Sequence, residues 1–130
     1  MRPRVLVVDN SSVVAKQVAN CFDAAGCEVV GICADGLSAV QQAGELQPDI
    51  VSFDLVLPRL AGLQMVASIK RLKLNCQFIA VSAVTARPRI ATAKALGVRY
   101  YVLKAIDPAK LELVGRTMIT ELTELARNVG

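Results

Sequence analysis

The sequence predicts an α/β fold in which five parallel strands alternate with five helices. Two observations lead to this prediction. Short, continuous apolar runs recur along the chain, and continuous rather than alternating apolarity is typical of strands covered on both faces. Each run is followed by a longer segment with apolar residues at helical spacing. Because strand–helix–strand crossovers are right-handed, this succession gives a doubly wound parallel sheet with helices on both faces.

The first half of the chain supplies three strands and two helices. We expect strands at residues 5–8, 28–33 and about 49–54, one helix from a cap at Ser11 or Ser12 to a stop at Gly26, and another over residues 37–46. Asp35-Gly36 between the second strand and the second helix predicts a turn. The third strand delivers Asp54 where its apolar run stops, and Pro58 prevents it from continuing.

The second half supplies the other elements. We expect strands at residues 77–81 and 99–103, and helices at about residues 60–73, 88–96 and 108–127. Pro88 lies in a first helical turn, where proline is tolerated, and Gly97 ends that helix. Asp107 can cap the last helix, with Pro108 at its first position.

The core is predicted to be aliphatic, because the chain has no Trp and only 4% aromatic residues. Hydrophobic residues make up 54% and charged residues 20%, which excludes a disordered chain. The predicted inward faces of four helices are Val14, Val18, Cys21, Phe22 and Ala25, then Leu37, Val40, Ala43 and Leu46, then Leu63, Val66, Ile69 and Leu72, and last Leu111, Val114, Met118, Leu122 and Leu125. A length of 130 residues indicates a single domain over residues 1–130, with an ordered core of about 4–127 and no output domain.

The net charge is +4, and the basic residues are scattered rather than gathered in a tail. We interpret the excess as a solvated surface biased toward an acidic protein partner, and we expect no direct binding of nucleic acid. The apolar run near the N-terminus is too short for a signal peptide or membrane span, so we expect a cytoplasmic protein that does not bind a membrane. The four cysteines lack zinc-ligand spacing and the chain has no His, so we expect reduced thiols and no zinc site.

Polar residues follow the predicted strands at the points where those strands end. Asp9-Asn10 follow the first strand, Asp54 the third, Ser82 the fourth and Lys104 the fifth. The carboxyl ends of parallel strands share one edge of an open sheet, where such folds bind ligands. Each residue alone could be an exposed strand end, a turn, a helix cap or a surface lysine. Their conjunction on one edge favours a functional site.

The chemistry of these groups is complementary. The Asp54 carboxylate could attack a phosphorus atom and form an acyl phosphate. Catalysis of such a transfer is mainly positioning and charge neutralisation, which Lys104 and the Ser82 hydroxyl could supply. Asp9 and Asp54 offer the hard oxygen ligands that Mg²⁺ prefers.

With these residues in place, the chain resembles the receiver domain of bacterial response regulators over essentially its whole length. The matching stretches are Val5-Leu6-Val7-Val8-Asp9, Pro48-Asp49 through Asp54-Leu55, Pro58, Gly62, Val81-Ser82-Ala83 and Tyr101-Val102-Leu103-Lys104. The resemblance implies a flavodoxin-like fold with strand order 2-1-3-4-5.

The resemblance also implies roles. Asp54 would accept phosphate from a sensor histidine kinase or phosphotransfer protein, and Mg²⁺ would be held by Asp9, Asn10, Asp54 and the backbone carbonyl of Val56. Ser82 would swing toward the phosphoryl group, Lys104 would contact it, and Tyr101 would couple the site to a distal face. That face comprises the helix near 87–96, the strand near 99–103 and the final helix. It would switch an output domain or effector protein, and it permits a homodimer.

Two residues depart from the family pattern. Receivers usually have two consecutive acids after the first strand, and here the second is Asn10. We expect Mg²⁺ to bind weakly, because one unit charge at contact is worth of order 4 kcal/mol at an effective dielectric of 20. Receivers usually have proline after the lysine, and here Ala105 follows Lys104. We expect a trans Lys104–Ala105 bond, because cis costs a non-proline residue about 3 kcal/mol.

Four functions compete on sequence grounds. The first is a phospho-switch, a signalling domain that catalyses at most its own phosphorylation and dephosphorylation. The second is a pseudo-receiver that binds proteins without phosphorylation, which Asn10 and Ala105 favour. The third is an FMN-binding protein, although Asn10-Ser11-Ser12 is only a faint phosphate loop. The fourth is a phosphatase with an aspartate nucleophile, which would need a second acid where Val56 stands.

Overall fold

A computed structural model describes residues 2–129 and has the predicted α/β fold. The five strands are β1 (Arg4–Val8), β2 (Glu28–Cys33), β3 (Ile50–Phe53), β4 (Gln77–Ser82) and β5 (Val98–Leu103). The five helices are α1 (Ser12–Ala25), α2 (Gly36–Leu46), α3 (Gly62–Arg71), α4 (Arg87–Ala95) and α5 (Pro108–Val129). The strands form one parallel sheet in the order β2-β1-β3-β4-β5, which confirms the predicted topology.

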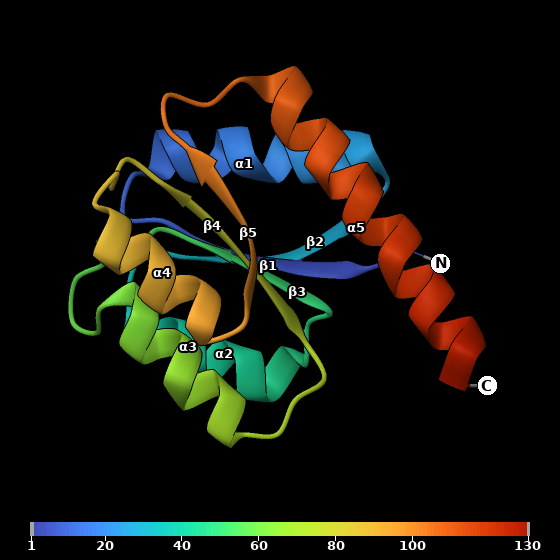
Figure 1. Cartoon of the computed structure of the whole chain (residues 1–130), viewed down its shortest axis with the longest axis horizontal. Coiled ribbons are helices and arrows are strands. Elements are labelled where there is room, and N and C mark those ends of the chain that lie inside the picture. Colours follow the sequence, from blue (N-terminus) through green and yellow to red (C-terminus); the bar gives the residue numbers. More distant parts are fainter. Residues whose placement is uncertain (1, 130) are drawn as a thin grey trace.

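The sheet lies between two layers of helices (Figure 1). Helices α1 and α5 cover one face, and α2, α3 and α4 cover the other. Each layer has its own core. Phe22, Leu111 and Met118 are buried in the first, and Leu6, Phe53 and other apolar residues are buried in the second. The sheet therefore has two buried faces, as the continuous apolar strands predicted.

The ends of several helices follow the local sequence. Ser11 accepts a hydrogen bond from the Val14 N–H and is the cap of α1, and Gly26 ends that helix at φ 106°. Asp35 is more than a turn residue, because its carboxylate caps α2 by accepting from the Ser38 N–H at 2.8 Å. The predicted α3 was too long at both ends, since Ala61 before it has extended backbone geometry.

The predicted inward faces are wrong at three helix-end positions. Leu37, Leu72 and Leu125 are 46%, 43% and 47% exposed. Helical spacing gives a direction around the helix axis, but it does not reveal where the neighbouring layer stops. The remaining predicted face residues are buried or half-buried.

The four cysteines are free, and Cys21, Cys27 and Cys33 are buried. Burial is the main cause that raises the pKa of each of these thiols, to about 11 for Cys27 and Cys33, so they remain neutral. Within residues 2–129, no helix combines the length and apolarity needed to cross a membrane.

A close backbone approach at Gly62 predicts sensitivity to a single methyl group. A Cβ at Gly62 would lie 2.5 Å from the Asp54 carbonyl oxygen and 2.8 Å from the Leu55 Cα. We expect Gly62→Ala to lower the free energy of unfolding by about 1–3 kcal/mol, because backbone must move to admit the methyl group. Gly44→Ala is the control, since its Cβ would meet only Leu72 Cδ1 at 3.7 Å. Urea denaturation measures both variants, and equal free energies of unfolding for Gly62→Ala and Gly44→Ala would contradict the close backbone contact at Gly62.

A polar cluster between β5 and α5 predicts a pH-dependent contribution to stability. Tyr100 Oη donates to Glu121, which also pairs with Arg99, and these contacts hold the Glu121 pKa below its usual value. A carboxyl with a lowered folded pKa stabilises the fold above its unfolded pKa, and this contribution is lost as pH falls through the folded pKa.

Glu121→Gln should therefore reduce the free energy of unfolding at neutral pH by about 0.2–1 kcal/mol, the range of solvent-screened pairs. The difference from the unsubstituted chain should shrink as the pH falls below the ordinary glutamate value of 4.5. Thermal denaturation across this range measures it, with the exposed Glu124→Gln as control. A difference independent of pH would rule out the ionic contribution.

Candidate functional site

The carboxyl edge of the sheet brings Asp9, Asp54, Ser82 and Lys104 together. Hydrogen bonds continue the strand ladders one residue further, because the Asp54 N–H donates to the Val8 carbonyl at 3.1 Å and the Lys104 N–H to the Ser82 carbonyl at 3.0 Å. The backbone thus fixes where each side chain starts. In the structure these four side chains lie together at one edge of the sheet, as predicted.

Lys104 lies between the two carboxylates. Its Nζ donates to Asp9 Oδ2 and to Asp54 Oδ2, both at 2.8 Å. The largest single influence on the Lys104 pKa is burial, which lowers it, but the hydrogen bonds and charges of the two carboxylates together outweigh burial and raise the pKa. The ammonium is therefore kept charged.

Asp54 is oriented by donors on both of its oxygens. Lys104 contacts Oδ2, while Oδ1 accepts from Ser82 Oγ at 2.7 Å and from the Val56 N–H at 3.1 Å. The Asp54 side chain is 14% exposed, whereas Ser82 is fully buried. Hydrogen bonds thus fix the orientation of the Asp54 carboxylate, which remains accessible to solvent.

Asp9 is more deeply buried than Asp54, since only 5% of its surface is exposed. Its Oδ1 accepts from the Ser11 N–H at 2.9 Å, and its Oδ2 faces Lys104. The sequence indicated Asp9 but not this backbone donor, because a main-chain N–H leaves no signature in residue type. The same holds for the Val56 N–H at Asp54.

Val84 connects the site to Tyr101 and was missed from the sequence. Its N–H donates to Ser82 Oγ at 3.3 Å, and its carbonyl accepts from Tyr101 Oη at 2.7 Å. A continuous series of hydrogen bonds therefore runs from Asp54 through Ser82 and Val84 to Tyr101. Both bonds at Val84 use its backbone, so an apolar residue type gave no reason to select it.

The oxygen atoms at the carboxyl edge suit a magnesium ion in part. The Asp9 and Asp54 oxygens converge closely enough to share one ammonium, so they could share one metal cation, and Mg²⁺ often takes only one or two carboxylates plus waters. Asn10 is exposed beside Asp9, and Val56 is 61% exposed in the loop after Asp54. No cluster of three or more His, Cys, Asp or Glu side chains suited to a metal occurs in residues 2–129. The residues fit a divalent ion with a reduced ligand charge.

The prediction of a trans bond after Lys104 is wrong. The Lys104–Ala105 peptide is cis. That prediction considered only the intrinsic preference of the peptide, whereas Lys104 is held at its N–H by Ser82 and at its Nζ by two carboxylates. These tertiary contacts decide the path of the chain here.

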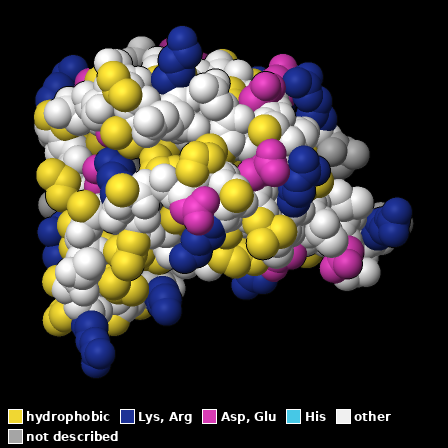
Figure 2. Space-filling view, turned by 90° about the horizontal axis from the view of Figure 1, so that it is seen from above, with side chains coloured by type: hydrophobic (Ala, Val, Ile, Leu, Met, Phe, Trp, Pro, Cys, Tyr) yellow, Lys and Arg dark blue, Asp and Glu magenta, His cyan; other side chains and the backbone are white. Residues whose placement is uncertain are grey.

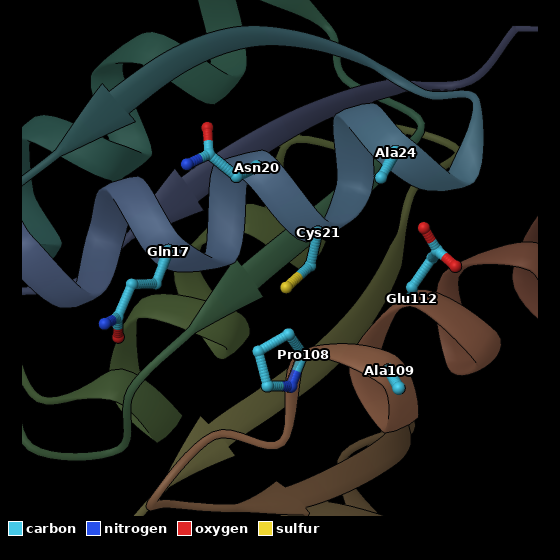
Figure 3. A pocket seen from close by; sticks show the side chains of 7 residues that line it. All are labelled: Gln17, Asn20, Cys21, Ala24, Pro108, Ala109 and Glu112. Carbon is cyan, nitrogen blue, oxygen red and sulfur yellow. The ribbon is translucent and has the colours of Figure 1, made fainter.

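A hollow of about 350 Å³ lies elsewhere, between α1 and the start of α5 (Figure 3). Cys21 Sγ points toward Pro108 inside it, and Gln17, Asn20 and Glu112 stand around it. Burial and the nearby Glu112 raise the pKa of the Cys21 thiol, so it offers no thiolate. None of the carboxyl-edge residues lines this hollow, which is separate from the site.

The carboxyl-edge groups together suit transfer of an anionic group to Asp54. The Asp54 carboxylate, which could act as a nucleophile, stands beside one ammonium and one hydroxyl, and these two groups could neutralise and orient the oxygens of a phosphoryl group. The arrangement provides no second acid at Val56, the position at which an aspartate-based phosphatase would need one.

Comparisons with known proteins agree with this geometry. Residues 5–114 match the model of the response regulator receiver domain. The chain is 29% identical over 111 residues to the chemotaxis protein CheY of Thermotoga maritima, covering 85% of this chain and 92% of that protein. It is 38% identical over 118 residues to a protein-glutamate methylesterase/protein-glutamine glutaminase of Nocardioides, covering 88% of this chain but only 31% of that protein.

A solved structure shares the fold and part of the sequence. A chain of the CheX–CheY–BeF₃–Mg²⁺ complex from Borrelia burgdorferi superimposes with a TM-score of 0.81 at 27% identity, covering 90% of this chain and 87% of that one. The family model covers nearly the whole described sheet together with the residues that converge at its carboxyl edge. The chain therefore belongs to the response regulator receiver domain family, the regulatory module of two-component signalling proteins.

Proposed function

We propose that this receiver accepts a phosphoryl group on Asp54 from a histidine kinase or phosphotransfer protein and thereby switches its protein interactions. The observation that carries the proposal is the convergence of Lys104 Nζ and Ser82 Oγ on the Asp54 carboxylate, at 2.8 and 2.7 Å. A nucleophile held by the two groups that would later hold its product is pre-organised for the transfer.

The transfer step is an in-line displacement. One Asp54 oxygen forms the new P–O bond, and the P–N bond of a donor phosphohistidine breaks with its electron pair remaining on the imidazole nitrogen. Lys104 then neutralises charge on the phosphoryl oxygens, and the Ser82 hydroxyl donates to one of them. The product carries more negative charge than the carboxylate that it replaces, which strengthens both interactions.

The readout follows from the hydrogen bonds at Val84. If Ser82 Oγ moves toward the phosphoryl group, its contact with the Val84 N–H changes, and the Val84 carbonyl is the acceptor for Tyr101. Tyr101 lies on β5, between α4 and α5 in the fold. The α4-β5-α5 face is thus the surface that would report phosphorylation, as an effector site or a homodimer contact.

The output arrangement is part of the same proposal. The CheY relative is matched over 92% of its length, whereas the methylesterase is matched over 31%. The receiver would act on a separate effector in the first arrangement and on a joined output domain in the second. Its place of action would be the cytoplasm, and beyond its own phosphorylation and dephosphorylation it would catalyse no reaction.

Mg²⁺ would be held by the carboxylates of Asp9 and Asp54, the Asn10 amide oxygen and the Val56 carbonyl. Bound there, the ion would neutralise negative charge beside the reacting oxygens. Because Asn10 supplies no charge and Lys104 already neutralises part of the site, we expect weak binding. The BeF₃ and Mg²⁺ in the CheY complex support a site of this kind in a relative.

Intact-mass spectrometry after incubation with acetyl phosphate tests the acceptor. The unsubstituted chain should gain one phosphoryl group that is labile to alkali, and Asp54→Asn should gain none, since an amide is not a nucleophile for phosphorus. Asp23→Asn on the exposed side of α1 is the matched control and should react normally. An unmodified chain that gains no phosphoryl group would favour the phosphorylation-independent receiver instead.

Calorimetric titration of Mg²⁺ into the unphosphorylated chain tests the metal site. Asn10→Asp should bind Mg²⁺ at least about tenfold more tightly than the unsubstituted chain, because it adds one ligand charge whose gain is partly offset by desolvation. Asn20→Asp adds the same charge on an exposed part of α1 and should have no effect. Equal affinities in all three proteins would refute the explanation based on Asn10.

A further inference from the structure

The charges of this chain are segregated along the sequence. Residues 55–106 contain nine Lys and Arg and no Asp or Glu, so this segment carries +9. The remaining residues contain six Lys and Arg and eleven Asp and Glu, and they carry −5. The segment begins just after β3 and includes α3, β4, α4 and β5.

Folding places much of this charge on the side of the sheet that α3 and α4 cover. Helices α3 and α4 lie on the same side of the sheet (Figure 1), and Lys70 Nζ near the end of α3 donates to the Leu96 carbonyl at the end of α4. We call the exposed basic side chains of these two ends and of α4 the basic face: Lys70, Arg71, Lys73, Arg87, Arg89 and Lys94. In the described part of the chain, none of these six is paired with a carboxylate.

The surface on the opposite side of the sheet is different. Figure 2 views the molecule from the side of α1 and α5, and there Asp and Glu side chains lie among Lys and Arg. The other basic residues of the segment also have partners, since Arg59 pairs with Asp35 at 3.5 Å and Arg99 pairs with Glu121. The basic face is the part of the segment whose charge is not balanced within the chain.

Helix stability does not explain all of this charge: it favours Lys70, Arg71 and Lys94 in the last turns of α3 and α4, but not the two arginines at the start of α4. Arg87 and Arg89 lie in the first turn of α4, where the helix dipole disfavours positive charge, and Ala86 provides no side-chain cap. Core packing does not explain it either, because Ala93 is the only residue of α4 that is buried. Arg87 and Arg89 lie where positive charge destabilises α4, which indicates that they serve an interaction outside this helix.

We propose that the basic face is a docking surface for an acidic segment of a separate protein. Charge complementarity selects the sign of the partner, and it chiefly accelerates encounter and suppresses wrong partners. Leu72, 43% exposed, stands between Arg71 and Lys73, so the segment would also carry an apolar side chain. The site is distinct from the carboxyl-edge residues, and it shares α4 but not β5 or α5 with the proposed switching face.

A nucleic acid fits this surface less well. Binding of single strands relies on aromatic side chains that stack on bases. In residues 55–106 Phe78 is buried, Tyr101 Oη is bonded to Val84, and Tyr100 is engaged with Glu121. The basic face therefore offers charge and an apolar side chain but no stacking platform.

Fluorescence anisotropy with the full chain tests the proposal. The probe is a short fluorescein-labelled peptide of Glu and Leu at helical spacing, compared with the same peptide containing Lys in place of Glu and with a single-stranded DNA of similar length. The Glu–Leu peptide should bind most tightly, and its affinity should fall with added salt. Tighter binding of DNA or of the Lys–Leu peptide would overturn the proposal.

Charge-reversal variants locate the site. Arg71→Glu/Lys73→Glu and Arg87→Glu/Lys94→Glu should each weaken peptide binding by about tenfold or more. Lys16→Glu/Lys110→Glu, at exposed positions of α1 and α5, is the matched control and should bind as the unsubstituted chain does. Glu at position 87 suits the helix dipole, whereas Glu at position 94 in the last turn opposes it, so circular dichroism checks that α4 stays folded.

Two results at this step would also overturn the proposal. One is equal loss of peptide binding in the control variant, which would show that net charge alone acts. The other is concentration-dependent self-association at low salt that the basic-face variants abolish, which would make the occupant a second copy of this chain. Neither result depends on whether Asp54 accepts a phosphoryl group.

Discussion

One ammonium between two carboxylates is the interaction on which the carboxyl edge depends. Asp9 and Asp54 come from neighbouring strands and would repel each other if Lys104 did not lie between them. Lys104 follows β5, which is two strands away from β3 in the sheet. The contact therefore connects β1, β3 and β5 at the carboxyl edge. Breaking it would leave two partly buried negative charges without a nearby cation, the costly outcome for buried ion pairs.

The same interaction supports the proposed switch at this site. Lys104 and Ser82 hold the unmodified Asp54, and both would serve a phosphoryl group on the same residue. A phosphoryl group on Asp54 would thus compete with the Asp54 carboxylate for the hydrogen bonds of Lys104 and Ser82. Ser82 is in turn connected to Tyr101 through hydrogen bonds to the Val84 backbone. The site and the proposed readout share a short path that uses both the N–H and the carbonyl of one residue.

The sequence predicted the fold and the grouping of four polar side chains at one edge for a physical reason. Apolar runs that end in polar residues mark the carboxyl ends of parallel strands, and these ends must meet at one edge. Asp9, Asp54, Ser82 and Lys104 could therefore be grouped without coordinates. Backbone donors such as the Val56 N–H could not, because they are independent of residue type. The exposure of Leu37 and Leu72 and the cis bond after Lys104 were missed because each depends on tertiary contacts.

The central claim is that Asp54 is the residue that carries the phosphoryl group. Its most direct test is reduction of the acetyl phosphate-treated chain with borohydride, followed by peptide sequencing in a mass spectrometer, because hydride converts an aspartyl acyl phosphate to homoserine. The account predicts homoserine at position 54 and unmodified Asp9 and Asp49. Homoserine at another aspartate, with Asp54 intact, would contradict it.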